Sequence, residues 1–172
     1  MNLVALSVLA LYACILLATA VIDAQRFIIP NRLVLALLAG FAIAGPLLLP
    51  LEMIPRHLAA GLVVLGVGLL LFRFRLLGGG DVKLFAAVAV WVGLNVVLIL
   101  HLLFVVLAGG ALSLLLLAAR TRLGREIVGP LMAVAGASPR VLDKGAPVPY
   151  AVAICVGSLA VVPWMPVFRG SF

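Results

Sequence analysis

The chain has 172 residues, of which 67% are hydrophobic and only 10% are charged, and its mean hydropathy is +1.42. One soluble core cannot bury this much apolar surface, so the composition excludes an ordinary soluble domain and predicts a single membrane-embedded domain over residues 1–172. The net charge of +7 would favour nucleic acid as the partner of a soluble protein. Here the basic residues lie between apolar runs, which is typical of cytoplasmic anchoring, so we expect membrane lipid and no nucleic acid.

The first apolar run, residues 3–22, carries no charge and is long enough to span a hydrocarbon core of about 30 Å. No Lys or Arg precedes it, so we expect a retained helix rather than a cleaved secretory signal. A polar connector over residues 23–31 follows. In this connector Pro30 favours an extended Ile29, and Asn31 is suited to cap the next helix. The second span is predicted at about residues 32–49.

The third and fourth spans are predicted on either side of a glycine triplet. A polar turn with Glu52, Arg56 and His57 precedes the third span, residues 58–72. The glycine triplet, residues 78–80, leads into Asp81 and a short fourth span over residues 82–92. Glycines at this position would let two backbones come close or let the loop adopt a positive φ.

The fifth span is predicted at residues 96–119 and the last at residues 149 to about 165. Residues 120–148 between them form the long polar connection, in which apolar side chains from Ile127 to Val134 are spaced for an interfacial helix. With six spans, ten Lys and Arg residues fall on one face of the membrane and two on the other. The sequence therefore predicts an all-α polytopic membrane protein with six transmembrane helices and both termini outside the cytoplasm.

Two acids adjoin the predicted spans at the same face of the membrane. Between Asp23 and Asp81 the chain crosses the membrane twice, whichever way it inserts, and an acid against a membrane span indicates function by default. Two neighbouring carboxyl groups titrate as a unit, one holding the proton that the other has lost. This arrangement suits hydrolysis of a peptide bond by general acid–base catalysis. The helix dipoles favour Asp81 as the base and Asp23 as the acid.

Other interpretations of these acids stay open at this point. The glycine triplet with Asp81 also fits a flexible turn ending in a capping residue, and Asp23 fits an interfacial acid balanced by Arg26. A small transporter could use both acids to relay protons or cations, although such sites commonly lie near the bilayer midplane and these acids lie at span ends. A structural scaffold is a third possibility. No metal site is predicted, because the chain lacks a C-x-x-C pair and a second histidine at i+4.

Three motifs together resemble the type IV prepilin peptidases, which are GxGD-type intramembrane aspartyl proteases. These motifs are Asp23 followed by residues 29–33, the run from Gly78 through Asp81 to Leu84, and residues 148–150 before the last span. The resemblance implies that Asp23 and Asp81 are the catalytic pair. It also implies substrate-binding or loop-shaping roles for Gly78, Gly80, Lys83, Pro30 and Asn31.

The same resemblance implies a substrate and a location. Such an enzyme removes the short basic leader of a prepilin or pseudopilin at the cytoplasmic face of the bacterial inner membrane, as a multi-pass protein without a metal or other cofactor. The chain lacks the additional cytoplasmic region of the larger bifunctional members, so N-methylation and S-adenosylmethionine are not expected. Its size is similar to that of the peptidases of Flp-type pili. The oligomeric state is left open.

Overall fold

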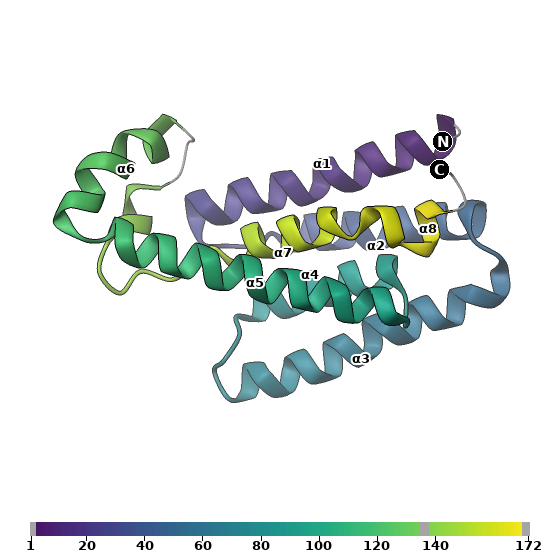
Figure 1. Ribbon diagram of the computed structural model, residues 1–172. Helices are drawn as coiled ribbons and strands as arrows, with labels where there is room; N and C mark the ends of the chain where they lie inside the picture. The colour runs from purple at the N-terminus through teal and green to yellow at the C-terminus, as the bar shows by residue number, and fades with distance from the viewer. Residues whose placement is uncertain (1–2, 135–137, 170–172) are drawn as a thin grey trace.

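The structure, a computed structural model, describes residues 3–134 and 138–169, and in this part of the chain the only regular secondary structure is helical (Figure 1). The all-α prediction is therefore confirmed for this part of the chain. The helices are α1 (Leu3–Arg26), α2 (Asn31–Leu48), η1 (Leu51–Met53), α3 (Ile54–Arg73), α4 (Gly79–Val92), α5 (Val96–Ala119), α6 (Arg122–Val134), η2 (Pro139–Leu142), α7 (Tyr150–Ala160), η3 (Val162–Trp164) and α8 (Pro166–Arg169).

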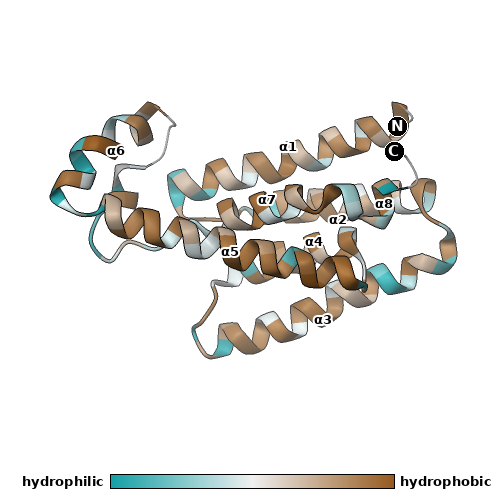
Figure 2. Cartoon of the chain, viewed as in Figure 1, coloured by the Kyte–Doolittle hydropathy of each residue, from teal (hydrophilic) through white to brown (hydrophobic). Residues whose placement is uncertain are grey.

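Four helical segments are long and apolar enough to cross a membrane: α1, α2, the segment Leu51–Arg73 that contains α3, and α5. Only 22 to 28% of the most apolar window in each segment is buried inside the molecule. Large apolar side chains such as Leu62 and Leu114 are 69% exposed, and the hydrophobic colour runs along these helices (Figure 2). Apolar surface of this extent indicates contact with lipid rather than with water.

The other two predicted spans correspond to short helices, as was expected for the fourth span but not for the last. Helix α4 has 14 residues and α7 has 11, whereas about 20 residues are needed to span the hydrocarbon core alone. The last span was predicted as one helix over residues 149–165, and this is wrong. Helix α7 ends at Ala160, and a 3-10 turn and α8 follow. Pro163 and Pro166 lie in these two elements, and proline has no backbone N–H to continue an α-helix.

The predicted polar turn before the third span is also wrong in part. Helix α3 begins at Ile54, so Arg56 and His57 are helical rather than part of a turn. The His57 side chain is buried, and its Nδ1 lies 2.8 Å from the carbonyl oxygen of Val90 in α4. Pro55 lies in the first turn of α3, where a missing N–H costs no hydrogen bond.

Aromatic side chains in the core fix the relative positions of α1, α2 and α4. The rings of Tyr12 in α1 and Trp91 in α4 have centroids 4.9 Å apart, and both side chains are fully buried. The Trp91 indole Nε1–H donates a hydrogen bond of 3.0 Å to the carbonyl of Leu37 in α2. Buried indole groups need such a partner, because an unpaired donor in an apolar core is costly.

The connections after α1, α3 and α5 lie together at one end of the bundle. The N-terminus and the C-terminus lie towards the opposite end (Figure 1). Helix α6 extends from the end of the bundle that holds these connections, and it corresponds to the predicted helix in the polar connection. Leu123, Ile127 and Leu131 on α6 are 67 to 70% exposed. The end of the bundle that carries α6 is also the end at which α1 finishes and α4 begins, so it holds both acids of the predicted pair.

Candidate active site

Asp23 lies in the last turn of α1, and its side chain is almost fully buried, with 6% of the residue exposed. The helix was expected to finish at residue 22, but it continues to Arg26. Phe27 then adopts a left-handed conformation with φ of 54°, and its N–H donates to the carbonyl of Asp23 at 2.8 Å. This bond closes the last helical turn. The non-helical connector is therefore only residues 27–30.

Asp81 is the third residue of α4 and lies in its first turn, as the sequence predicted. Gly78 precedes the helix in an extended conformation, with φ of −74° and ψ of 146°. A Cβ atom on Gly78 would lie 2.7 Å from Oδ2 of Asp81. The glycine is thus needed for close approach of the backbone to the carboxylate, and the positive φ considered from the sequence is not used at this position.

Gly80 is needed for a close approach of a different kind. A Cβ atom on Gly80 would lie 3.1 Å from Cβ of Ile29, in the connector between α1 and α2. This connector begins four residues after Asp23. The glycine triplet before Asp81 therefore packs directly beside the segment that follows Asp23 in the chain. The tight packing of these two segments brings the start of α4 to the end of α1.

A cavity of about 320 Å³ lies at the meeting of these segments. Both acids contribute to its wall, and so do four of the five other residues that the sequence analysis assigned to the site. Pro30 is the exception. The lining residues are Asp23, Phe27, Ile28, Ile29, Asn31, Gly78, Gly79, Gly80, Asp81 and Lys83.

The two acids interact electrostatically across this cavity. Burial raises the pKa of the Asp81 carboxyl from its ordinary value to about 6. The charge of Asp23 raises the pKa of Asp81 further, and a backbone hydrogen bond with Gly78 opposes the increase. Like charges in a partly buried site disfavour simultaneous ionisation. One carboxyl group of the pair therefore retains a proton towards neutral pH.

Asp23 has a partner that stabilises its ionised form. The backbone N–H of Ala151 donates a hydrogen bond of 3.0 Å to Oδ2 of Asp23. Ala151 lies in the first turn of α7, where backbone N–H groups have no acceptor within the helix and the helix dipole is positive. A carboxylate at such a position is stabilised in its charged form.

Asn31 and Lys83 form one edge of the cavity. The Lys83 ammonium donates to Oδ1 of Asn31 at 3.2 Å, which joins the start of α2 to α4. The prediction that Asn31 caps α2 is wrong. Pro30 occupies the capping position, with φ of −67° and ψ of 128°, and no side chain caps this helix. The Asn31 amide is directed to Lys83 instead, because α4 passes alongside.

The Ala151 amide is the part of the site that the residue chemistry did not predict. A backbone donor leaves no mark in the sequence, since every residue except proline carries one. The only signal was the motif at residues 148–150, which was noted for its resemblance and not for a contact with Asp23. Phe27 and Ile28 were missed as lining residues for a similar reason, because apolar side chains in a short connector have no distinctive pattern.

The structure contains a larger cavity of about 420 Å³ between α3, α4 and α5. Its lining is apolar apart from Tyr150 and includes no carboxyl group, so it offers no acid or base for hydrolysis. Among the described residues, no group of three or more His, Cys, Asp or Glu side chains could hold a metal ion. The ionisable groups at the smaller cavity are the two carboxyl groups and the Lys83 ammonium.

Comparison with known proteins identifies the family. The model of the type IV leader peptidase family matches residues 10–118, a range that contains both acids and the glycine triplet. No curated protein and no solved structure matches the chain. The family match covers more than half of the sequence and agrees with the resemblance of its motifs. The chain therefore belongs to the type IV leader peptidase family.

Proposed function

We propose that this protein is an aspartyl endopeptidase that removes the short basic leader from Flp-like type IV prepilins, with Asp23 and Asp81 as its catalytic pair. Membership of a leader peptidase family supports a peptidase acting on prepilins. The observation that carries the aspartyl mechanism is the shared cavity, to which α1 and α4 each contribute one interacting carboxyl group.

The surroundings of the two acids favour Asp23 as the base and Asp81 as the acid. The Ala151 N–H stabilises a negative charge on Asp23, and the raised pKa of Asp81 keeps its proton available. This assignment reverses the expectation from helix dipoles. That expectation considered α1 and α4 alone and could not include the first turn of α7, which is contributed by a distant part of the chain.

In the proposed reaction, ionised Asp23 takes a proton from a water molecule as the water oxygen attacks the scissile carbonyl carbon. Asp81 gives its proton to the carbonyl oxygen, so that a neutral tetrahedral intermediate forms. When this intermediate collapses, the C–N bond breaks, the new amine receives the proton held by Asp23, and a hydroxyl proton returns to Asp81. Both acids then have their initial protonation states.

The location of the cavity supports cleavage at the cytoplasmic face of the inner membrane. The cavity lies at the end of the bundle where the connections after α1, α3 and α5 gather. These connections and the helix ends beside them hold ten of the twelve Lys and Arg residues. Such residues mark the cytoplasmic side of a membrane protein. The proposal retains a multi-pass arrangement of six crossings with both termini outside, in which α4 and α7 form the two short crossings.

The transporter alternative gains no support from these observations. Both acids lie at one end of the bundle, at the last turn of α1 and the first turn of α4. A relay through the bilayer needs ionisable groups near its midplane, and the family match is to peptidases.

Co-expression with a Flp-like prepilin tests the proposed function. Asp23→Asn and Asp81→Asn should each leave the prepilin uncleaved in a gel mobility assay, while the enzyme remains in the membrane fraction at its normal level. Glu52→Gln is the matched control, because Glu52 is an exposed acid in η1, at the opposite end of the bundle. Normal processing by either aspartate variant would refute the aspartyl mechanism.

A further inference from the structure

The stretch from Ser138 through η2 to the first turn of α7 is attached to α1 at two points, the backbone of Ala24 and the side chain of Asp23. At its start, the N–H of Ser138 donates to the carbonyl of Ala24, the residue after Asp23, at 3.1 Å. At its end, the N–H of Ala151 donates to the Asp23 carboxylate at 3.0 Å. We call residues 138–149 the clamp segment. The position of the Asp23 carboxyl group relative to its donor thus depends on how this segment is folded.

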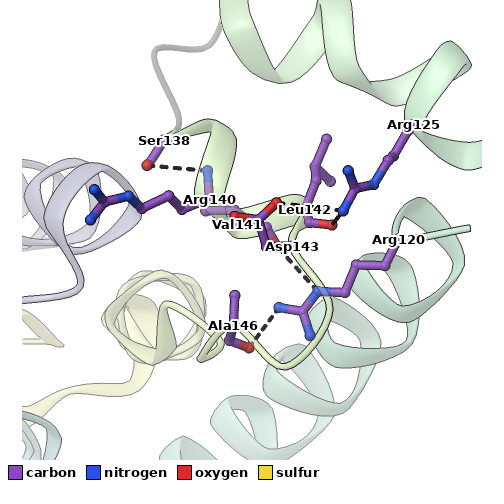
Figure 3. A network of polar contacts seen from close by, with 8 residues as sticks. All are labelled: Arg120, Arg125, Ser138, Arg140, Val141, Leu142, Asp143 and Ala146. Carbon is purple, nitrogen blue, oxygen red and sulfur yellow. Dashed lines mark hydrogen bonds and ion pairs between the residues drawn. The ribbon is translucent and has the colours of Figure 1, made fainter.

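Arg120, at the end of α5, holds the clamp segment through its backbone (Figure 3). Its Nε–H donates to the carbonyl of Val141 at 3.1 Å, and Nη2 donates to the carbonyl of Ala146 at 2.8 Å and to that of Pro147 at 3.4 Å. One guanidinium therefore spans the turn around Gly145, whose φ is 81°. The planar fork of arginine suits several acceptors at fixed positions, which a lysine ammonium cannot reproduce.

Arg125 makes a second attachment to the same segment, at residues farther along the chain from Ala151. Its Nη2 donates to the carbonyl of Leu142 and lies 3.5 Å from Oδ1 of Asp143. Arg120 differs because it reaches Ala146 and Pro147, which lead directly through Pro149 into the first turn of α7. The hydrogen bonds of Arg120 go to carbonyl groups rather than to a carboxylate, so its effect on Asp23 is geometric.

We infer that Arg120 is a positioning residue for the Asp23 carboxylate, acting through the clamp segment and the Ala151 amide. This inference rests on the proposed function, since it explains how one member of the catalytic pair is kept ionised. Loss of the guanidinium frees residues 146 and 147, and the Ala151 N–H then no longer stays at hydrogen-bonding distance from Asp23. The base becomes harder to ionise, while the other walls of the cavity are unchanged.

The effect on pH dependence follows from the groups that face Asp23. The ionisable groups that share its cavity are Asp81 and Lys83, both from α4, and α7 contributes the neutral Ala151 amide. All of these remain in an Arg120 variant. Loss of the amide hydrogen bond raises the pKa of the base, so the ascending limb of the pH–rate profile moves to higher pH. A general loss of folded enzyme would lower the rate at every pH without moving this limb.

The test compares Arg120→Gln and Arg120→Lys with Arg122→Gln, using purified enzyme and a purified prepilin between pH 4.5 and 9. Arg122 is the matched control, because its side chain is 97% exposed and its ion pair with Glu126 is 3.9 Å long. We expect Arg120→Gln to lower kcat roughly tenfold with little change in KM and to shift the ascending limb by roughly half a pH unit or more. Arg120→Lys should lie between this variant and the wild type.

Wild-type kcat and an unshifted pH profile for Arg120→Gln would overturn the inference. If Arg120→Gln does not fold, Arg120→Lys decides the question by the same two readouts, because it retains the positive charge and most of the side-chain length. The Asp23→Asn and Asp81→Asn variants separate this failure from that of the proposed function. If they are inactive while both Arg120 variants behave as wild type, only the role of Arg120 is refuted.

Discussion

The backbone amide of Ala151 donates a hydrogen bond to the carboxylate of Asp23 across 128 positions of sequence. This bond joins the first turn of α7 to the last turn of α1 and gives Asp23 a donor that favours its ionised form. Asp81, in the same cavity, has a pKa raised by burial and by the charge of Asp23. The two acids thus occupy different environments, which agrees with the proposed roles of general base and general acid.

Gly78→Ala should impair catalysis with little effect on folding. The new Cβ would lie 2.7 Å from Oδ2 of Asp81, so the carboxyl group must move away from its position in the cavity. We expect a decrease in kcat of roughly tenfold or more, because small displacements of catalytic groups are costly. Leader cleavage by the purified variant measures this effect.

Gly79→Ala is the control for this substitution. Its Cβ would lie 3.4 Å from the nearest atom, in the Phe72 ring, which is an ordinary contact. The rate for Gly79→Ala should stay within about twofold of the wild type. Equal losses in the two variants would show that the turn tolerates no added methyl group, and the specific role of Gly78 beside Asp81 would be refuted.

The sequence predicted the two acids and their common face because this inference needed only the number of membrane crossings between them. Its assignment of Asp81 as the base, from the helix dipoles, is opposite to the one that we propose, because the donor that favours ionised Asp23 is a backbone amide from a distant helix. The break of the last span at Ala160 was missed because the apolar run continues through Pro163. The predicted helix cap at Asn31 was wrong because the Asn31 side chain accepts a hydrogen bond from Lys83 in α4. The prediction considered only the residues next to the helix end.

The ionisation of Asp81 should depend on Asp23. The chain contains only three aspartates, so the carboxyl carbons can be followed individually by NMR after labelling with ¹³C-aspartate. We expect Asp81 to titrate with a pKa of about 6 in the wild type. In Asp23→Asn, its pKa should decrease towards the ordinary value, because the neighbouring negative charge is removed.

Asp143→Asn supplies the comparison for this titration. The Asp143 side chain, in the connection between α5 and α7, is 61% exposed and pairs with Arg125. Removal of the Asp143 charge should therefore leave the titration of Asp81 unchanged. A pKa of Asp81 that does not respond to Asp23→Asn would mean that the two carboxyl groups do not interact in the folded protein.

Gly157→Ala should destabilise the packing of α7 against α5. The added Cβ would lie 2.4 Å from Cγ2 of Val105 and 2.8 Å from its backbone nitrogen, so the two helices must separate. Overpacking of this kind costs about 1–3 kcal/mol, and we expect a lower midpoint of thermal unfolding in detergent. Activity should also fall, because α7 carries the Ala151 amide.

Gly110→Ala provides the reference for that measurement. Gly110 lies in the same helix as Val105, and a Cβ at this position would meet no atom within 4 Å. Its unfolding midpoint should equal or slightly exceed that of the wild type, because alanine favours the helix. Similar midpoints for Gly157→Ala and Gly110→Ala would contradict the close packing of α5 and α7.

The catalytic pairing of Asp23 and Asp81 is tested most directly by the rate of leader cleavage in purified Asp23→Asn, Asp81→Asn and the double variant. If the two carboxyl groups act as one unit, each single substitution should lower kcat by roughly a hundredfold or more, and the double substitution should lower it no further. A single variant that keeps more than roughly a tenth of the wild-type rate, or losses that multiply in the double variant, would contradict a shared catalytic role.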